Sequence, residues 1–577
     1  MSEFSVAAAT RRFGDLKLSA SQARRLIIAI DFGTTFFRNS LLLSRSARGN
    51  TKLVLNWPGA RGVTTPKIPT VVKYGVSGDC EFEWGALVKN QNGSIIGIKL
   101  LLDKKQPLPW HVPNSFRMDL DALPKTPEAI ATDFLREMHS HALAQIATKI
   151  PQAALDLFSK EYIMSVPAVW SDAAKNATLK AATQAGISPV SLIKEPEAAA
   201  LYTIRRLDAN LDPTDVIVIC DAGGGTVDLV SYEIEATYPT LQLKEIVPGT
   251  GKMVGSMALN LRFEAAVQEI IPAHKWETLK SSRAMTQASI QFEEEIKKTF
   301  HGDLDEEYYV NFPRAGLDDD PANNLESNEW RMTGSDVAKI FEPVMFDIVQ
   351  LINDQVQSVR AKSKSVKVDG SRTCYELPIN VEQAIFLVGG FGSNQYLRVR
   401  VEKANPDIRV VQPDDAWAAI AEGAALSRMP DNAVVTSVSA VRHYGIQSKG
   451  PFHPIIDKGQ QTFSNYRDGV MSWYIRAGDI INRSQKIRIA LHKELPEYFS
   501  PEQCTVKSIL FDCEDRMMGR SSEALVNGGI QELEPEELEP YWLLRFYLVI
   551  SFESALMKFS LEFDGETMGS VDAHFEQ

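Results

Sequence analysis

Two segments of the sequence share one design: an apolar run, a turn containing glycine and threonine, and a second apolar run. The first segment extends from Arg24 to Leu43 and turns at Asp31 to Thr35. The second extends from Asp215 to Ile234 and turns at Asp221 to Asp228. β-Branched and aliphatic residues on both sides of such a turn predict a buried β-hairpin. Two similar hairpins in one chain predict two similar lobes.

Each turn places backbone N–H groups and threonine hydroxyls beside a carboxylate. This combination can bind a polyphosphate, and the aspartate can hold a hydrated cation. Taken alone, the turn at Asp31 to Thr35 is as consistent with an ordinary Asx or ST turn as with a phosphate site. The turn at Asp221 to Asp228 is more specific, because three consecutive glycines stand between two carboxylates. The two turns together favour a nucleotide site.

Strands alternate with helices between and after the hairpins. Tyr162 to Val166 is typical of a strand, Ser171 can cap a helix that ends near Gly186, and Pro196 stands at the start of another helix. This alternation predicts an α/β core. Residues 258–356 are mostly helical in pattern, with a polar, acidic loop at 316–328, and predict a subdomain that caps one lobe.

The character of the chain changes after Arg428. Short alternating strands follow Asn432, such as Ser472 to Arg476 and Phe546 to Phe552, and predict a separate β-rich module. The predicted organisation is a disordered tail at 1–23, a nucleotide-binding domain at 24–428 with lobes at about 24–207 and 208–428, and a β-rich module at 429–577.

Composition excludes several classes of protein. A chain of 577 residues needs more than one core, and its net charge of -13 argues against binding to nucleic acid. Five cysteines without metal-ligand spacing indicate reduced thiols in a reducing compartment. No apolar run is long enough for a membrane span, and no secretory signal is visible. We therefore expect a cytosolic or nuclear protein without nucleic-acid or membrane partners.

Several motifs resemble one family. The two hairpins resemble the phosphate loops of the actin, sugar-kinase and heat-shock ATPase superfamily, whose fold is two-lobed and ribonuclease-H-like. Within it, the segments Ser165 to Asp172, Ile193 to Ala200 and Leu387 to Gly392 resemble the 70-kDa heat-shock chaperones. The resemblance runs from about Leu26 to Arg428. The pattern of the residues that follow is similar to that of the divergent, short-tailed branch of the family.

This resemblance implies that the cleft binds ATP or ADP with Mg²⁺. It implies catalytic roles for Lys99, Glu195, Asp221 and Thr226. Asp31 and Asp221 would hold the magnesium ion through water. It implies that the nucleotide is contacted by Gly33, Thr34, Thr35, Gly223, Gly224, Gly225, Glu294, Lys297, Lys298, Gly389, Gly390, Phe391 and Asp414.

Some of these residues have a second interpretation of equal weight. Lys99 is also consistent with a solvated lysine on an amphipathic helix. Glu294 and Lys297 are also consistent with an exposed i,i+3 charge pair. Asp414 is also consistent with a helix cap.

The chain departs from the family pattern around the predicted site. Lys298 and Ser393 stand where the family has arginines beside the adenine, and lysine stacks less well than a planar guanidinium. Phe36, Phe37 and Arg38 follow the first turn, where smaller residues are common.

Departures also affect the connection between the domains. Lys175 replaces the arginine of the interdomain switch, and Met429 to Ser439 contains no leucine run like that of the chaperone linker. The segment from Val247 to Met253 lacks the first glycine of a P-loop and the serine or threonine that follows its lysine, and we expect a plain loop near the cleft there.

Three functions remain open. The favoured one is a slowly ATP-hydrolysing chaperone whose lobes close on Mg-ATP and signal to a β module that binds a protein client. The alternative is a nucleotide-sensing scaffold, a pseudo-ATPase with little turnover and one dedicated partner. A small-molecule kinase is favoured least, because it requires a base carboxylate beside a sugar pocket.

Overall fold

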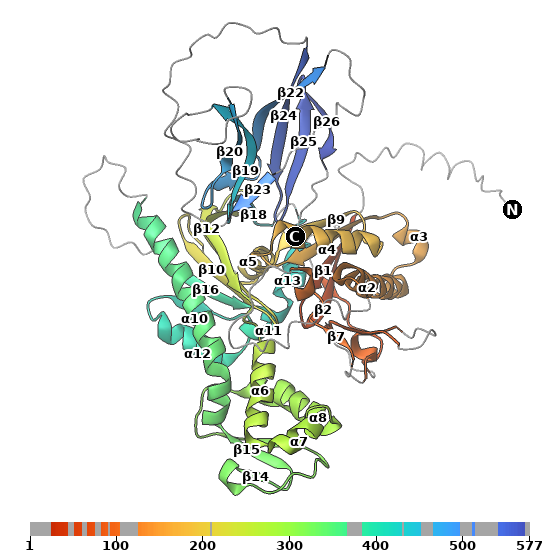
Figure 1. Ribbon diagram of the computed structural model, residues 1–577, viewed down its shortest axis with the longest axis vertical. Helices are drawn as coiled ribbons and strands as arrows, with labels where there is room; N and C mark the ends of the chain where they lie inside the picture. The colour runs from red at the N-terminus through yellow and green to blue at the C-terminus, as the bar shows by residue number, and fades with distance from the viewer. Residues whose placement is uncertain are drawn as a thin grey trace, which may run out of the picture.

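The computed structural model describes most of the predicted nucleotide-binding domain and the strands of the β-rich module. The described residues are 25–43, 51–60, 66–75, 82–89, 93–103, 125–207, 211–365, 383–429, 432–451, 466–496, 510–513 and 541–571. Figure 1 shows two lobes side by side, β strands gathered at one end of them, and a helical subdomain at the opposite end.

Lobe I is built on the first hairpin. Its main sheet contains, in order, β3 (Lys52–Leu53), β2 (Phe36–Leu43), β1 (Arg25–Phe32), β8 (Ser159–Val166) and β9 (Val190–Lys194), with β4 (Ile68–Pro69) paired to β2. A small sheet beside it contains β6 (Glu83–Trp84), β5 (Val71–Lys73) and β7 (Ile95–Ile96). The predicted hairpin is confirmed, because β1 and β2 are antiparallel and Phe32 pairs with Phe37.

Two helices cover one face of this sheet. They are α2 (Pro127–Lys149) and α4 (Asp172–Gln184), and the short α3 (Gln152–Leu155) follows α2. The predicted cap is confirmed, because the Ser171 hydroxyl accepts the Ala174 N–H at 3.2 Å and satisfies a donor that the helix leaves free. Phe134 of α2 packs against Phe32 and Phe37 in the buried core.

Lobe II repeats the plan. Its sheet contains, in order, β17 (Arg409–Val411), β16 (Gln383–Val388), β10 (Val216–Ala222), β11 (Val227–Ala236), β12 (Gln242–Lys252), β18 (Val434–Ser439) and β21 (Ile480–Asn482). In both lobes the first hairpin strand has its antiparallel partner on one side and a parallel strand on the other. The prediction of a loop at 247–253 is wrong for most of that segment, because β12 continues to Lys252. Thr250, Gly251 and Lys252 all pair with β11.

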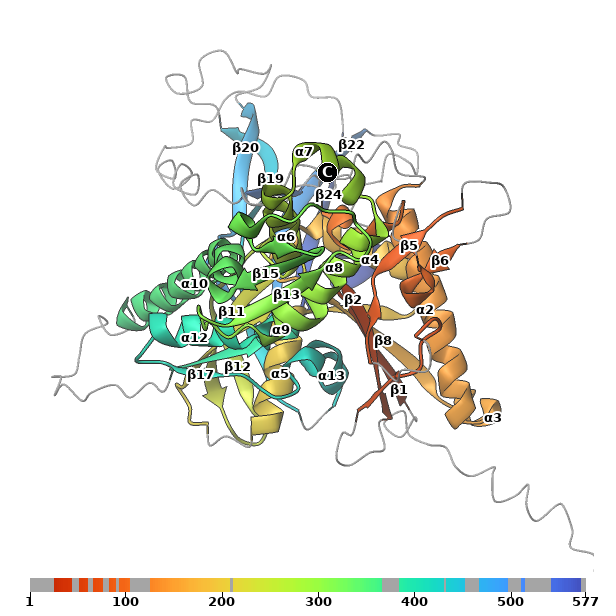
Figure 2. The ribbon, with the colours of Figure 1, turned by 90° about the horizontal axis from the view of Figure 1, so that it is seen from below.

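The helices α5 (Glu195–Leu207) and α13 (Ala419–Leu426) pack together between the two sheets, as Figures 1 and 2 both show. Their backbones approach so closely that a Cβ atom on Gly423 would lie 1.8 Å from the Ala198 carbonyl oxygen. Only glycine fits such an approach. The apolar cluster around these helices draws on both sheets, which makes this crossing the connection between the lobes.

The predicted capping subdomain contains more β structure than expected. Its helices are α6 (Met257–Ile270), α7 (Ala273–Leu279), α8 (Arg283–Gln291), the π-helical turn η6 (Phe292–Ile296), α9 (Lys297–Thr299) and α10 (Gly334–Ser365). A three-stranded sheet of β13 (Glu307–Asn311), β15 (Glu329–Thr333) and β14 (Leu325–Glu326) interrupts them. The alternation of exposed and buried residues in β13 marks the hairpin, but the strands are too short for a clear pattern.

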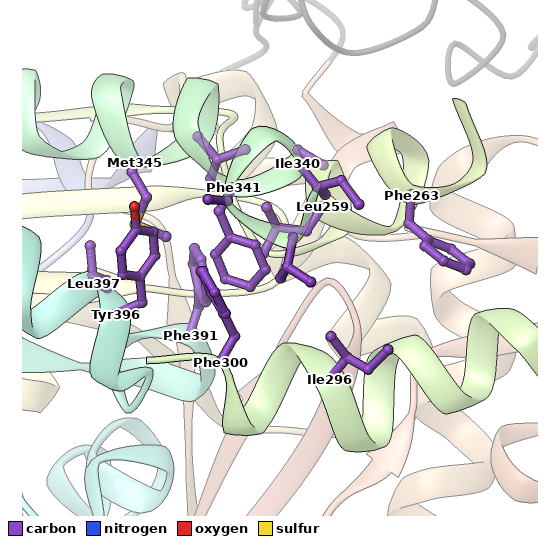
Figure 3. Close-up of a cluster of buried hydrophobic side chains, with 14 of the residues drawn as sticks. Leu259, Phe263, Ile296, Phe300, Ile340, Phe341, Met345, Phe391, Tyr396 and Leu397 are labelled. Atoms are coloured by element: carbon purple, nitrogen blue, oxygen red, sulfur yellow. The ribbon is translucent and has the colours of Figure 1, made fainter. Parts of the chain in front are cut away.

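A buried cluster joins this subdomain to the rest of lobe II. Figure 3 shows side chains from α6, α10, α12 (Gln395–Ala404) and the turn after β16 packed together. Phe300, Phe341 and Tyr396 are in mutual contact, with ring centroids 4.8–5.9 Å apart. The cluster therefore fixes the position of α9 relative to the strand β16.

The β-rich module is joined to lobe II by strand pairing. Its further strands form one sheet of β20 (Tyr466–Ile475), β19 (His443–Pro451) and β23 (Leu510–Cys513), and another of β22 (Lys486–Pro496), β24 (Tyr541–Phe552), β25 (Met557–Phe563) and β26 (Glu566–Val571). The strand β18 lies parallel to β12 at the edge of the lobe II sheet. Pairing needs only backbone donors and acceptors at a free edge, so it requires no leucine run.

Candidate functional site

A cavity of about 170 Å³ lies between the lobes, with walls from both hairpin turns. It brings together nearly all residues that the sequence predicted. The predicted residues in its lining are Asp31, Gly33, Thr34, Thr35, Lys99, Glu195, Asp221, Gly223, Gly224, Gly225, Thr226, Glu294, Lys297, Lys298, Gly389, Gly390 and Phe391. Residues of this cavity thus come from positions far apart in the chain.

The two turns touch across the cavity. A Cβ atom on Gly224 would lie 2.3 Å from Oγ1 of Thr35, and one on Gly225 would lie 2.6 Å from Oγ1 of Thr34. Both distances are far below ordinary contact, so the threonines of one lobe occupy the space that glycine leaves in the other. This arrangement brings two hydroxyls and two stretches of backbone N–H groups to one point.

The second turn is held by the start of α6. The backbone N–H groups of Gly255, Ser256 and Met257 donate to the carbonyl oxygens of Gly225, Gly223 and Gly224 at 2.8–3.2 Å. Ser256 also lines the cavity and was not among the predicted site residues. A glycine and a serine directly before an apolar helical pattern are the signal that could have identified this helix start.

Lys99 lies inside the cleft and not on a solvated surface. It immediately precedes the 3-10 turn η3 (Leu100–Leu102), its exposed fraction is 2%, and its ammonium group donates to Oε1 of Glu195. The Trp170 ring centroid is 5.6 Å from the same nitrogen. The interpretation of Lys99 as a solvated lysine is therefore wrong, since the lysine is paired and buried where a phosphate could reach it.

Buried carboxylates repel one another beside this ion pair. Burial, opposed by Lys99 and reinforced by Asp228 and Asp31, raises the pKa of Glu195 to about 7. Burial and the charges of Glu195, Asp228 and Asp31 raise the pKa of Asp221 well above its usual value, although Lys99 opposes them. A cavity that concentrates negative charge in this way favours a ligand that brings cations or a protein group that supplies them.

The other wall of the cavity is formed by η6 and α9. Lys297 is buried and donates to Oδ1 of Asn260 at 2.9 Å and to Glu293 at 3.3 Å, while Lys298 pairs with Glu294. The predicted i,i+3 pair of Glu294 and Lys297 is therefore not formed. A π-helical turn places these side chains, and such turns are frequent at functional sites.

The turn after β16 closes this wall. Gly389, Gly390 and Phe391 line the cavity, and the Ser393 hydroxyl donates to the Gly390 carbonyl at 2.9 Å. Asn394, which was not among the predicted site residues, also lines the cavity, and its amide donates to the Lys297 carbonyl at 3.0 Å. This bond ties the turn to α9, so the two predicted nucleotide-contacting segments form one connected wall.

Asp414 is the predicted site residue that the structure places elsewhere. It is exposed in the loop after β17 and takes no part in the cavity lining. Additional lining residues that sequence reasoning did not assign to the site are Phe36, Arg38, Lys67, Glu293 and Ile420. Phe36 and Arg38 were visible as unusual residues after the first turn, but their direction depends on strand register.

The carboxylates fit the predicted water-held magnesium ion only in part. Asp221 has no ion-pair partner within the described ranges. Oδ2 of Asp31, however, accepts a hydrogen bond from Nη1 of Arg38 at 2.8 Å, and both side chains are buried. Among the described residues, no group of three or more His, Cys, Asp or Glu side chains is arranged to hold a metal ion directly. The pairing of Asp31 with arginine disagrees with its predicted role as a magnesium holder.

Two lobes built on equivalent hairpins, with both turns facing one cavity, define an actin-like nucleotide-binding fold. A family model described as Hsp70 protein matches residues 108–238, a range that contains β8, α5 and the second turn. The human protein named Heat shock 70 kDa protein 12A is 22% identical over 522 residues, which cover 75% of this chain and 73% of that protein. The chain is therefore similar to heat-shock-70 proteins, and it has the two-lobed, actin-like fold that its motifs predicted.

None of the helices in the described part of the chain combines the length and the apolar character that a membrane span requires.

Proposed function

We propose that the cleft binds ATP and ADP, hydrolyses ATP slowly, and signals to the β-rich module, which binds a protein client in the cytosol or nucleus. The observation that carries this proposal is the contact of Thr34 and Thr35 with Gly225 and Gly224. It holds two phosphate-binding turns from different lobes at one point. A nucleotide that inserts its phosphates between them changes the separation of the lobes.

The groups for phosphoryl transfer to water are present beside the turns. Lys99 supplies a fixed cation, and Glu195 is a carboxylate whose pKa of about 7 suits the orientation of an attacking water near neutral pH. Thr226 and the N–H groups of Gly223 to Gly225 would cradle the phosphates. These groups favour hydrolysis over simple binding.

The route from the cleft to the β module is short. Helix α5 begins with Glu195, which lies in the cleft. Two residues later, the Glu197 carboxylate accepts hydrogen bonds from Arg483 and Ser554 of the module. A movement of α5 that follows the nucleotide therefore displaces the module directly. This proximity supports signalling between the two parts.

The second candidate, a nucleotide-sensing scaffold with little turnover, also has support. The ion pair between Arg38 and Asp31 occupies a carboxylate that the hydrolytic interpretation needs. Binding would persist in such a protein, while chemistry would be slow. The two candidates differ in turnover and not in affinity.

The test is calorimetric titration with ATP, ADP and GTP, each with magnesium, together with phosphate release at saturating nucleotide. Adenine-selective binding with slow release that Asp221→Ala abolishes would support the ATPase. Binding without release would favour the scaffold. Absence of binding to all three nucleotides would contradict both candidates. The function would then lie in the β module, and binding of client peptides to the protein would test it.

A further inference from the structure

Arg38 points into the nucleotide cavity from the strand β2. It lies directly opposite Asp31 in the β1–β2 ladder and its Nη1 donates to Oδ2 of that aspartate at 2.8 Å. Its exposed fraction is 7%, and it lines the cavity. The Nε atom of Arg38 is buried without a hydrogen-bond partner. Nη2 of Arg38 lies 3.9 Å from the position of a Cβ atom on Gly390, which also lines the cavity, so an acceptor bound there can reach the guanidinium.

The second hairpin has the opposite charge at the equivalent position. In the β10–β11 ladder Asp221 lies opposite Asp228, as Asp31 lies opposite Arg38 in the first. Asp228 accepts backbone N–H groups of Ala168 and Val169 at 3.0 and 3.4 Å, so it serves the backbone. The two halves of the site are therefore not equivalent electrostatically: the first hairpin carries its own cation.

More positive charge surrounds Arg38. Lys67 lines the same cavity, with its Nζ 4.1 Å from the Phe36 ring centroid. Burial, and after it the charges of Arg38 and Lys298, lower the pKa of Lys67, which is consistent with three cations close together. Cations that repel one another favour a polyanion between them.

Arginine is well suited to this position. Its planar fork can donate to a carboxylate through one edge and to a phosphate through another, and it stays charged at every physiological pH. Hydrogen bonds of this charge-assisted kind are among the strongest in proteins. A divalent cation held by Asp31 would instead have to displace a buried ion pair, which leaves the guanidinium without its partner.

We propose that Arg38 is a resident cation of the phosphate site, which bridges Asp31 and the bound polyphosphate and makes nucleotide affinity largely independent of magnesium. The inference rests on the proposed nucleotide binding. It differs from the magnesium-dependent site that the resemblance implied, because one of the two expected carboxylates is already neutralised by the chain itself.

The test measures ATP and ADP affinity by calorimetry in EDTA and in excess magnesium, for the wild type, Arg38→Ala and Arg38→Lys. The wild type should bind with affinities within about threefold of each other in the two conditions. Arg38→Ala should lose at least about tenfold in EDTA and recover most of that loss in magnesium, because Asp31 becomes available. Arg38→Lys keeps the positive charge, so its affinity in EDTA should lie between those of the wild type and Arg38→Ala. Its binding would also show that a substitution at this position leaves the site folded.

A second readout needs no nucleotide. Manganese titrated into the proteins and followed by electron paramagnetic resonance should bind Arg38→Ala more tightly than the wild type. The matched control is Arg136→Ala on α2, whose arginine is half exposed, is paired with Asp133 and lies outside the cavity lining. It should behave as the wild type in both assays.

The outcomes separate the two proposals. Wild-type binding that requires magnesium, with no difference in metal dependence between the wild type and Arg38→Ala, would overturn the role of Arg38 and leave nucleotide binding intact. Failure of the wild type to bind nucleotide in either condition would overturn the proposed function itself.

Discussion

Arg483 of the β-rich module donates through both of its terminal nitrogens to the two carboxylate oxygens of Glu197 on α5, with Nη1 2.8 Å from Oε1. The Ser554 hydroxyl donates to the same carboxylate and accepts the Lys194 N–H at 3.2 Å. Burial raises the pKa of Glu197, but the charge and hydrogen bonds of Arg483 outweigh it and hold that pKa below its usual value. The module is thus attached to the helix that carries Glu195.

Further contacts attach the module to lobe I. The Tyr444 hydroxyl of β19 donates to Asp172 at 2.9 Å, and the other oxygen of that carboxylate accepts from Lys175 at 3.1 Å. Ala555, in the turn between β24 and β25, belongs to the buried core of lobe I. Lys175 therefore pairs with the carboxylate that Tyr444 of the module contacts.

Removal of Arg483 should destabilise the protein strongly. In Arg483→Ala the carboxylate of Glu197, 3% exposed, stays buried without its cation, and we expect a loss of about 3 kcal/mol in the free energy of unfolding. Urea denaturation measures this. The matched control is Arg136→Ala, which removes a half-exposed arginine and leaves Asp133 paired with Lys125, and it should cost less than about 1 kcal/mol. Similar losses in the two variants would contradict the buried linkage.

Gly225→Ala should weaken nucleotide binding by forcing the turns apart. Its new Cβ would meet the Thr34 side chain of the other lobe at 2.6 Å, an overpacking that costs roughly 1–3 kcal/mol. Calorimetry should therefore show an affinity at least about tenfold lower. Gly223→Ala is the matched variant, because its Cβ meets only the Thr226 carbonyl of its own turn, at 3.2 Å. Equal affinities for both variants would argue against contact between the turns as the determinant.

Lys99→Ala should slow ATP hydrolysis far more than it weakens ATP binding. The ammonium of Lys99 is fixed by Glu195, and its charge is needed most when negative charge develops in the transition state. We expect phosphate release to fall by about 10²–10³-fold while the Kd for ATP changes less than about tenfold. Lys149→Ala at the exposed end of α2 is the control. Losses of equal size in release and binding would remove the proposed catalytic role.

The buried carboxyl of Glu195 should make stability depend on pH. Its pKa is about 7 in the folded chain and near 4.5 when unfolded, so the folded state binds the proton more tightly. The resulting stabilisation is complete below about pH 4.5 and is lost as the pH rises through about 7. Glu195→Gln cannot ionise and does not lose this stabilisation. From about pH 5 to about pH 8, its free energy of unfolding should therefore rise by roughly 2 kcal/mol relative to that of the wild type.

Urea denaturation at a series of pH values checks this difference. Glu277→Gln, which changes an exposed carboxylate on α7, should follow the wild-type curve. A constant difference between Glu195→Gln and the wild type at every pH would mean that the carboxyl titrates normally in the folded chain.

The sequence by itself determined the parts whose signal is local. Each hairpin is a continuous segment in which apolar runs flank a glycine-containing turn, so its strands and its turn could be read directly. The helix starts at Ser171 and Pro196 were identified for the same reason, because caps act within one turn of helix. These local patterns were sufficient to predict the α/β fold and most of the cavity lining.

Only the tertiary structure decided how distant segments meet. The Arg483–Glu197 pair joins residues 286 positions apart, and no pattern in either segment specifies the other. The direction of Arg38 depends on its register opposite Asp31, since a shift of one residue would turn its side chain to the other face of the sheet. Asp414, in a loop that looked equivalent to that of the family, was placed outside the cavity by the path of the chain after β17. Charge pairing and burial arise from three-dimensional proximity, and that is why the electrostatics of the site followed from the fold and not from the motifs.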